Sequence, residues 1–87
     1  MIAVIRSRGY ASDAITLLKI YSDANWEYQI TYYYDESGPG HDVTWVCIYQ
    51  MGEREIGRGE PARNKQEAKK LAAVKALDRL RREGHRF

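Results

Sequence analysis

The 87-residue sequence has one cysteine, two prolines and one phenylalanine, and its charges nearly cancel, with 14 basic and 12 acidic residues. A single cysteine excludes an internal disulfide and any zinc site built from several cysteines. Cys47 lies in an apolar stretch, where a packed thiol is expected rather than a reactive one. The apolar residues 1–5 are too few to span a membrane, and no basic residues precede them as in a signal peptide. We expect one intracellular domain, cytoplasmic or nuclear, with no membrane partner.

Catalytic and metal-binding patterns are also missing. There are two pairs of carboxylates, Asp35 with Glu36 and Glu53 with Glu55, but nothing in the sequence places them in a pocket with a nucleophile. There is no phosphate-binding P-loop, no HExxH pattern and no cluster of cysteine and histidine. We therefore expect a protein that is not an enzyme by itself and that holds no cofactor and no metal.

Periodicity indicates two helices that flank three strands. From Trp26 to Asp35 large and polar residues alternate, which is typical of a half-buried strand. Ser12 and Asp13 are candidate N-caps of the first helix, and Gly84 is a candidate C-cap of the second. The expected order is a tail (1–11), a helix (12–22), strands at 26–35, 43–49 and 54–58, a helix (63–80) and a tail (84–87). The pattern is α-β-β-β-α, and we expect the domain to cover residues 12–83.

The apolar stripe of the second helix becomes basic toward its N-terminal end. On a helical wheel Ala72, Ala76 and Leu80 share one arc, and Lys65 and Lys69 lie on that same arc. Unpaired ammonium groups are costly in an apolar core, so we expect the first turns to overhang the body of the protein and to point their lysines outward. Such a helix end, with its unpaired backbone N–H groups, suits a phosphate ligand.

The charges are distributed unevenly. From Arg63 onward the chain has nine basic residues against three acidic ones, and the rest of the chain is net acidic. A basic segment on an acidic body predicts a local binding surface for a polyanion. A solvated amphipathic helix is the alternative explanation of the same charges.

Four sequence features occur together in the order that one family shows. Gly38-Pro39-Gly40-His41 is a G-P-x-H loop, Trp45 follows it, Gly57-Arg58-Gly59 is a G-x-G, and residues 64–77 form a lysine- and alanine-rich helix. In these features the chain resembles the double-stranded RNA-binding domain over about residues 12–83. The resemblance implies an α+β fold, a three-stranded antiparallel sheet with two helices packed on one face.

The resemblance also implies a partner and a binding mode. It implies sequence-independent binding of double-stranded RNA, with contacts to two minor grooves and to the phosphates of the major groove between them. Pro39, Gly40 and His41 would enter one minor groove, and the first helix would lie in the other, which implicates Ser12 and Lys19. The phosphate contacts expected from the second helix come from Lys65, Gln66 and Lys69 by resemblance and from Arg63, Asn64 and Lys70 by position.

Some residues depart from the family pattern. Gln66 stands where the family has a second lysine, and Lys19 stands where the family usually has a glutamate that accepts from a hydroxyl. The acid Glu60 is expected near the phosphates. His41 has an alternative role, in which the imidazole caps a loop carbonyl, and His85 is expected to be exposed without a partner.

These departures leave a second function open. Tyr33, Val46 and Ile48 are expected to point away from the helices, so the open sheet face is a candidate surface for a protein partner or for a homodimer. The alternative function is therefore a protein-interaction or dimerisation module of the same fold. As a third possibility, the chain is the non-catalytic part of a larger RNA-processing enzyme.

Overall fold

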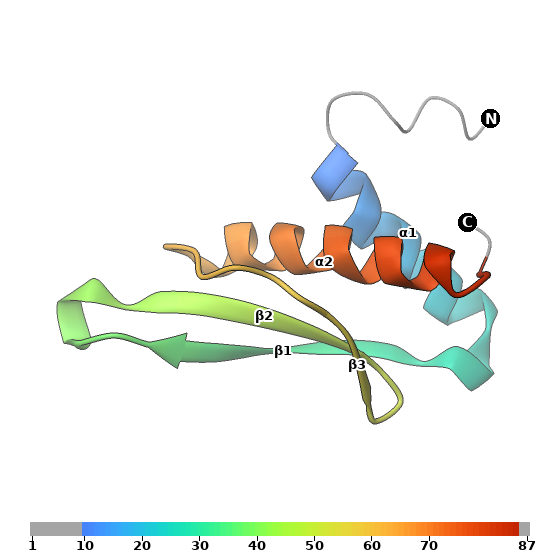
Figure 1. Cartoon of the computed structure of the whole chain (residues 1–87), viewed down its shortest axis with the longest axis horizontal. Coiled ribbons are helices and arrows are strands. Elements are labelled where there is room, and N and C mark those ends of the chain that lie inside the picture. The colour runs from blue at the N-terminus through green and yellow to red at the C-terminus, as the bar shows by residue number, and fades with distance from the viewer. Residues whose placement is uncertain (1–9, 86–87) are drawn as a thin grey trace.

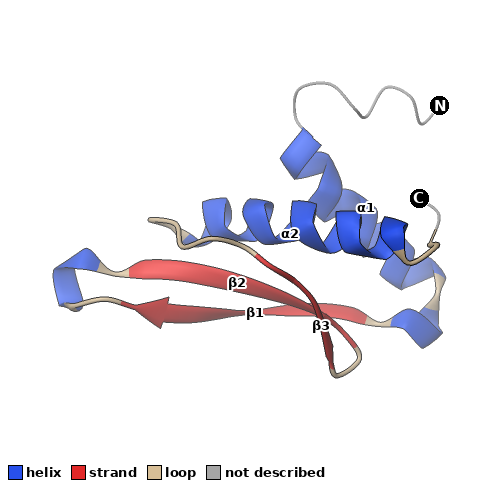
Figure 2. Ribbon diagram, viewed as in Figure 1, coloured by secondary structure: helices blue, strands red, loops and turns tan. Residues whose placement is uncertain are grey.

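Two helices cover one side of a three-stranded antiparallel sheet (Figures 1 and 2). The computed structural model describes residues 10–85, without the side chains of residues 10–13 and Trp26. The sheet order is β1-β2-β3, which makes both outer strands edges. The elements are α1 (Tyr10–Ala24), β1 (Ile30–Ser37), β2 (Thr44–Met51), β3 (Arg54–Arg58) and α2 (Lys65–Arg82), with short 3-10 turns at Trp26–Tyr28 and Gly40–Asp42. The predicted α-β-β-β-α order is confirmed.

Two predicted boundaries are wrong. Helix α1 begins at Tyr10, so Ser12 and Asp13 lie inside the helix and are not its N-cap. The first strand begins at Ile30 and not at Trp26, because the Tyr28 N–H donates to the Asn25 carbonyl at 2.7 Å and closes a 3-10 turn. Ser22 Oγ then accepts from the Ile30 N–H at 2.9 Å, which joins the end of α1 to the start of the strand.

Strand register divides the sheet into two faces. Tyr32 pairs with Tyr49, and Tyr34 pairs with Cys47, so these side chains share the face that the helices cover. Tyr33 pairs with Ile48 on the opposite, open face. The thiol of Cys47 is fully buried, which confirms the expected packed cysteine, and this burial raises its pKa to about 11.

Helix α2 approaches the sheet closely through small residues. A Cβ atom on Gly57 would lie 2.5 Å from the backbone nitrogen of Ala76, and one on Gly59 would lie 2.7 Å from that of Ala72. The alanines on this face of α2 are completely buried. The G-x-G sequence is therefore required by the contact between helix and sheet, because any side chain there would separate the two layers.

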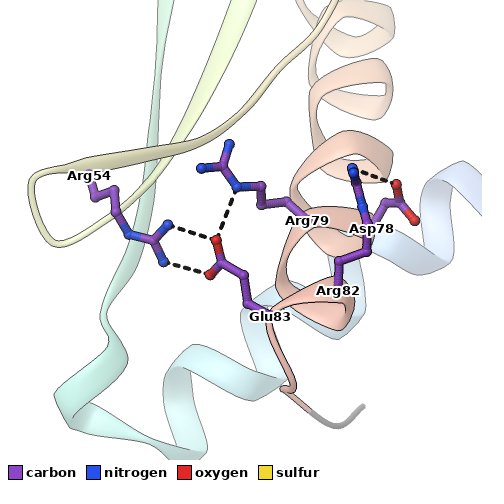
Figure 3. A network of polar contacts seen from close by, with 5 residues as sticks. All are labelled: Arg54, Asp78, Arg79, Arg82 and Glu83. Carbon is purple, nitrogen blue, oxygen red and sulfur yellow. Dashed lines mark hydrogen bonds and ion pairs between the residues drawn. The ribbon is translucent and has the colours of Figure 1, made fainter.

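Polar contacts hold the C-terminal end of α2 against the rest of the domain (Figure 3). Gly84 has φ +100°, and the N–H groups of Gly84 and His85 donate to the carbonyls of Arg81 and Leu80, which confirms the predicted glycine cap. The Glu83 carboxylate accepts from both guanidinium NH2 groups of Arg54 and from Nε of Arg79, at 2.8–3.0 Å. This network joins the β2–β3 turn to the helix end.

We predict that Gly57→Ala destabilises the domain by about 1–3 kcal/mol, because the new methyl group must displace the backbone of α2. Gly40→Ala is the matched control, since nothing lies within 4 Å of a Cβ at that position and the loss there should stay within about 0.5 kcal/mol. Urea unfolding measures both. If the two variants have the same free energy of unfolding, the close contact between α2 and the sheet does not contribute to stability as proposed.

The Glu83 network predicts a pH dependence of stability. Hydrogen bonds from Arg54 and Arg79 lower the pKa of Glu83 from 4.5 to about 2. A lowered pKa stabilises the fold above pH 4.5, and this stabilisation disappears as the pH falls toward 2. The difference in unfolding free energy between wild type and Glu83→Gln should shrink over that interval and vanish at its acid end.

The control for this pH series is Glu53→Gln, which removes a carboxylate from the same β2–β3 turn. Glu53 has no ion pair within residues 10–85, so its substitution should change stability little at any pH in the series. A gap between wild type and Glu83→Gln that stays constant from pH 4.5 to 2 would contradict the role given to Glu83.

Candidate nucleic-acid interface

The start of α2 is fixed by two sets of backbone and side-chain contacts. The loop before the helix pairs with β2, where the N–H and carbonyl groups of Ala62 and Trp45 bond each other at 2.8 and 2.9 Å. Asn64 is the N-cap, and its Oδ1 accepts from the Glu67 N–H at 2.8 Å. This cap uses one acceptor site of the Asn64 amide oxygen and leaves the amide NH2 free to donate to a ligand.

The two lysines on the apolar arc of α2 lie over aromatic rings. Lys65 Nζ is 4.7 Å from the ring centroid of Trp45 and 5.4 Å from that of Tyr34, and Lys69 Nζ is 4.0 Å from that of Tyr32. Lys65 is exposed and Lys69 is half-buried. The expected overhang is therefore wrong: the first turns lie above the sheet, where ring faces accept the ammonium groups that an aliphatic core would reject.

The two ends of α2 differ in how their charges are paired. Toward the C-terminus, Lys75, Arg79 and Arg82 form ion pairs with Glu60, Glu83 and Asp78. In the described part of the chain, the basic residues at the other end form none; these are Arg63, Lys65, Lys69 and Lys70. Gln66 is exposed among them. Among the described residues Arg81, in the last turn, also has no ion pair, so three of the four basic residues toward the C-terminus are paired and the unpaired positive charge is greatest at the N-terminal end of the helix.

Glu60 does not lie where it was expected. The sequence placed this acid near the phosphate contacts, but its carboxylate lies 3.8 Å from Lys75 Nζ, three turns of helix along from Asn64. The longer loop therefore brings no acid to the unpaired lysines.

The loop between β1 and β2 is a short exposed turn. Gly38 has φ +104°, and a Cβ there would lie 2.5 Å from the carbonyl oxygen of Asp42, so only glycine fits. The Asp42 N–H donates to the Pro39 carbonyl at 2.8 Å and closes a 3-10 turn. Pro39, Gly40 and His41 are exposed on this turn.

Helix α1 contributes one basic residue whose side chain the structure describes. Lys19 is exposed and its Nζ lies 3.3 Å from Asp23 Oδ2, which offsets part of its charge. The side chain of Ser12 lies outside the described residues. Lys19 of α1 and Lys69 of α2 line the same cleft of about 330 Å³, with Tyr32 in its wall.

The three regions follow one another along the molecule. Figure 1 shows the β1–β2 loop at one end, the start of α2 next to it, and α1 toward the other end. A long ligand that lies along this direction can meet all three, whereas a small ligand cannot.

The open face of the sheet presents little apolar surface. Tyr33 is 43% exposed, but Ile48 is fully buried and Val46 is half-buried. Arg58 and Glu55 are ion-paired at the neighbouring edge strand, at 3.1 Å. Of the three side chains expected there, only Tyr33 is largely exposed, and Val46 adds a smaller accessible area.

The two histidines lie in different surroundings. Within residues 10–85, the exposed imidazole of His41 has no hydrogen bond, which gives no support to its alternative capping role. The expectation for His85 is wrong: its Nδ1 lies 2.6 Å from the Tyr21 hydroxyl, and its ring packs edge-on against Tyr21 and Tyr28. His85 joins the end of α2 to the end of α1.

Sequence reasoning did not identify the rings of Tyr32, Tyr34 and Trp45 as part of this surface. The available signal was the combination of two patterns, lysines on the apolar arc of a helix and aromatic residues on one face of a strand. Each pattern is ambiguous alone, because a helical wheel gives a direction and not the element that lies in that direction.

Neither a metal site nor a membrane span adds to this surface. The described residues contain no group of three or more histidine, cysteine, aspartate or glutamate side chains that could hold a metal ion. No helix among residues 10–85 is long and apolar enough to cross a membrane.

The fold and this basic surface define a small nucleic-acid-binding domain, and comparison identifies its family. The family model named double-stranded RNA binding motif matches residues 14–80, so the chain belongs to that family. The family takes its name from binding. Ribonuclease 3 of Geobacter sulfurreducens is 44% identical over 46 residues, which are 53% of this chain and 18% of that protein. The similarity therefore spans less than a fifth of that relative.

Proposed function

We propose that this domain, residues 12–83, binds double-stranded RNA by its shape and independently of its sequence. One observation carries the proposal: the unpaired cations of α2 gather at its N-terminal end, while near its C-terminal end Lys75, Arg79 and Arg82 are paired with acids and Arg81 alone has no ion pair among the described residues. Such a surface suits the phosphates of a nucleic acid, because contacts between basic side chains and phosphates do not depend on the base sequence.

Three contact regions make up the proposed interface. The Pro39–His41 turn enters one minor groove, and α1 lies along the other through Lys19 and Ser12. The phosphates between them contact the start of α2, where the residues proposed are Arg63, Asn64, Lys65, Gln66, Lys69 and Lys70. A duplex with A-form geometry suits this arrangement, because it presents shallow minor grooves and 2′-hydroxyls on either side of a narrow major groove.

The interface has fewer charges than its lysine positions suggest. Gln66 donates a hydrogen bond without a charge, and Lys19 shares its charge with Asp23. We therefore expect binding to rest mainly on Lys65 and Lys69, with a weak contribution from α1. The alternative, a protein-interaction module, has little support from the open face, since Tyr33 is the one largely exposed side chain of the three named there, Val46 is half-buried and Ile48 is fully buried.

The similarity to Ribonuclease 3 suggests a wider setting. The match covers 18% of that protein, so its activity does not follow for this chain. We propose that the domain brings duplex RNA to a partner or to further domains that carry out RNA processing inside the cell.

The proposal predicts selectivity among nucleic acids. Duplex RNA of about 16 base pairs should bind far more tightly than duplex DNA or single-stranded RNA of the same length, because only the A-form duplex has the groove spacing and the 2′-hydroxyls that three contacts need. A gel-shift or anisotropy titration at moderate salt measures this. Equal affinity for duplex DNA would leave only nonspecific charge attraction and would refute shape recognition.

The proposal also predicts which end of α2 contributes to duplex RNA binding. Lys65→Gln should weaken duplex binding by roughly 1 kcal/mol and lower the slope of log affinity against log salt by about one contact. Lys75→Gln is the matched control, because it removes the same charge from the paired half of the same helix and should change both quantities little. If both substitutions act equally, the location of the charge is irrelevant and the proposed interface is wrong.

A further inference from the structure

Three aromatic rings lie beneath the first turns of α2, on the helix-covered face of the sheet. They come from β1 and β2, and each has a lysine ammonium group within 6 Å of its centroid. Lys69 Nζ is closest, at 4.0 Å from the ring of Tyr32. These distances are within the range of cation–π attraction.

The placement follows from contacts elsewhere in the fold. Gly57 and Gly59 let α2 lie close to the sheet, which brings the lysine side chains down to the rings. The backbone pairing of Trp45 with Ala62 holds the start of the helix above one of these rings. Since neither lysine forms an ion pair in the described part of the chain, the rings are the groups that orient them.

An aromatic ring orients an ammonium group without neutralising it. A carboxylate partner, such as Glu60 for Lys75, offsets the charge that a phosphate would need. A ring contacts one side of the ammonium group, so N–H donors on the other side remain for a phosphate oxygen. A lysine side chain has many rotamers, and confining it before the ligand arrives reduces the entropy lost on binding.

We propose that Tyr32, Tyr34 and Trp45 are positioning residues for duplex RNA: they hold Lys65 and Lys69 in place for the phosphates and do not contact the RNA themselves. The inference rests on the proposed function, in which the start of α2 binds phosphates. It adds that the affinity depends on the faces of these rings and not on the tyrosine hydroxyls.

Tyr32 is the best position for a test. Its side chain is 45% exposed and is not part of the buried core, whereas Tyr34 and Trp45 pack against that core. Tyr32→Leu removes the ring and keeps an apolar side chain, and Tyr32→Phe keeps the ring and removes only the hydroxyl. Thermal unfolding of both variants checks that the fold is retained.

Duplex RNA affinity is then measured for wild type and variants over a series of salt concentrations. Tyr32→Leu should lose about two- to fivefold in affinity, the scale of an exposed cation–π contact, with an unchanged salt slope because Lys69 keeps its charge. Tyr32→Phe should bind like wild type. In a Lys69→Gln background, Tyr32→Leu should cause no further loss, since the two residues act through one contact.

Proton NMR supplies a structural readout. The ε-methylene protons of Lys69 should be shifted upfield by the ring in wild type and in Tyr32→Phe, both free and bound to RNA, and should lose this shift in Tyr32→Leu. If the shift disappears when RNA binds, the lysine leaves the ring and the inference is wrong. Wild-type binding that Tyr32→Leu leaves unchanged or strengthens overturns the inference alone, whereas a wild type that does not bind duplex RNA overturns the proposed function as well.

Discussion

The close approach of α2 to the sheet is the constraint on which the rest of the structure depends. Gly57 and Gly59 have no side chains, so the backbone of the helix near Ala72 and Ala76 can rest almost directly on β3 and on the segment that follows it. At this distance the lysine side chains of the first turns reach the aromatic rings of β1 and β2. A larger residue at either glycine would lift the helix and would move the lysines away from the rings.

Helix α2 has two ends with different roles, although both are rich in basic residues. Near the C-terminus Lys75, Arg79 and Arg82 are bound to acids, and the bidentate contact of Arg54 with Glu83 connects the helix to the β2–β3 turn. These charges stabilise the fold and are largely offset. Near the N-terminus the cations lie on rings, which leaves their charge available. The same residue types therefore serve structure at one end and, as we propose, ligand binding at the other.

Much of the fold could be predicted from the sequence, because periodicity reports which side of an element is buried. The alternation of Tyr32 and Tyr34 with their neighbours predicted β1, and Gly84 predicted the end of α2. The 3-10 turn at Trp26–Tyr28 was missed because it continues the same alternation while its backbone bonds differ. The partners of Lys69 and of His85 were missed because each partner comes from an element distant in sequence. The residues of a single helix, or of the segment after it, do not show which element packs against them. For the candidate site, the sequence predicted the residue types and their order along the chain. It did not predict their tertiary contacts.

The most direct test of the account is an NMR titration of the ¹⁵N-labelled protein with duplex RNA of about 16 base pairs, the span of this family on RNA. The account predicts that the largest changes in amide signals fall on Gly40, His41, Gln66 and Lys69, with smaller changes near Lys19. Signals from the open sheet face, such as those of Tyr33 and Ile48, should move little. Changes concentrated on that open face, with the start of α2 unaffected, would contradict the account.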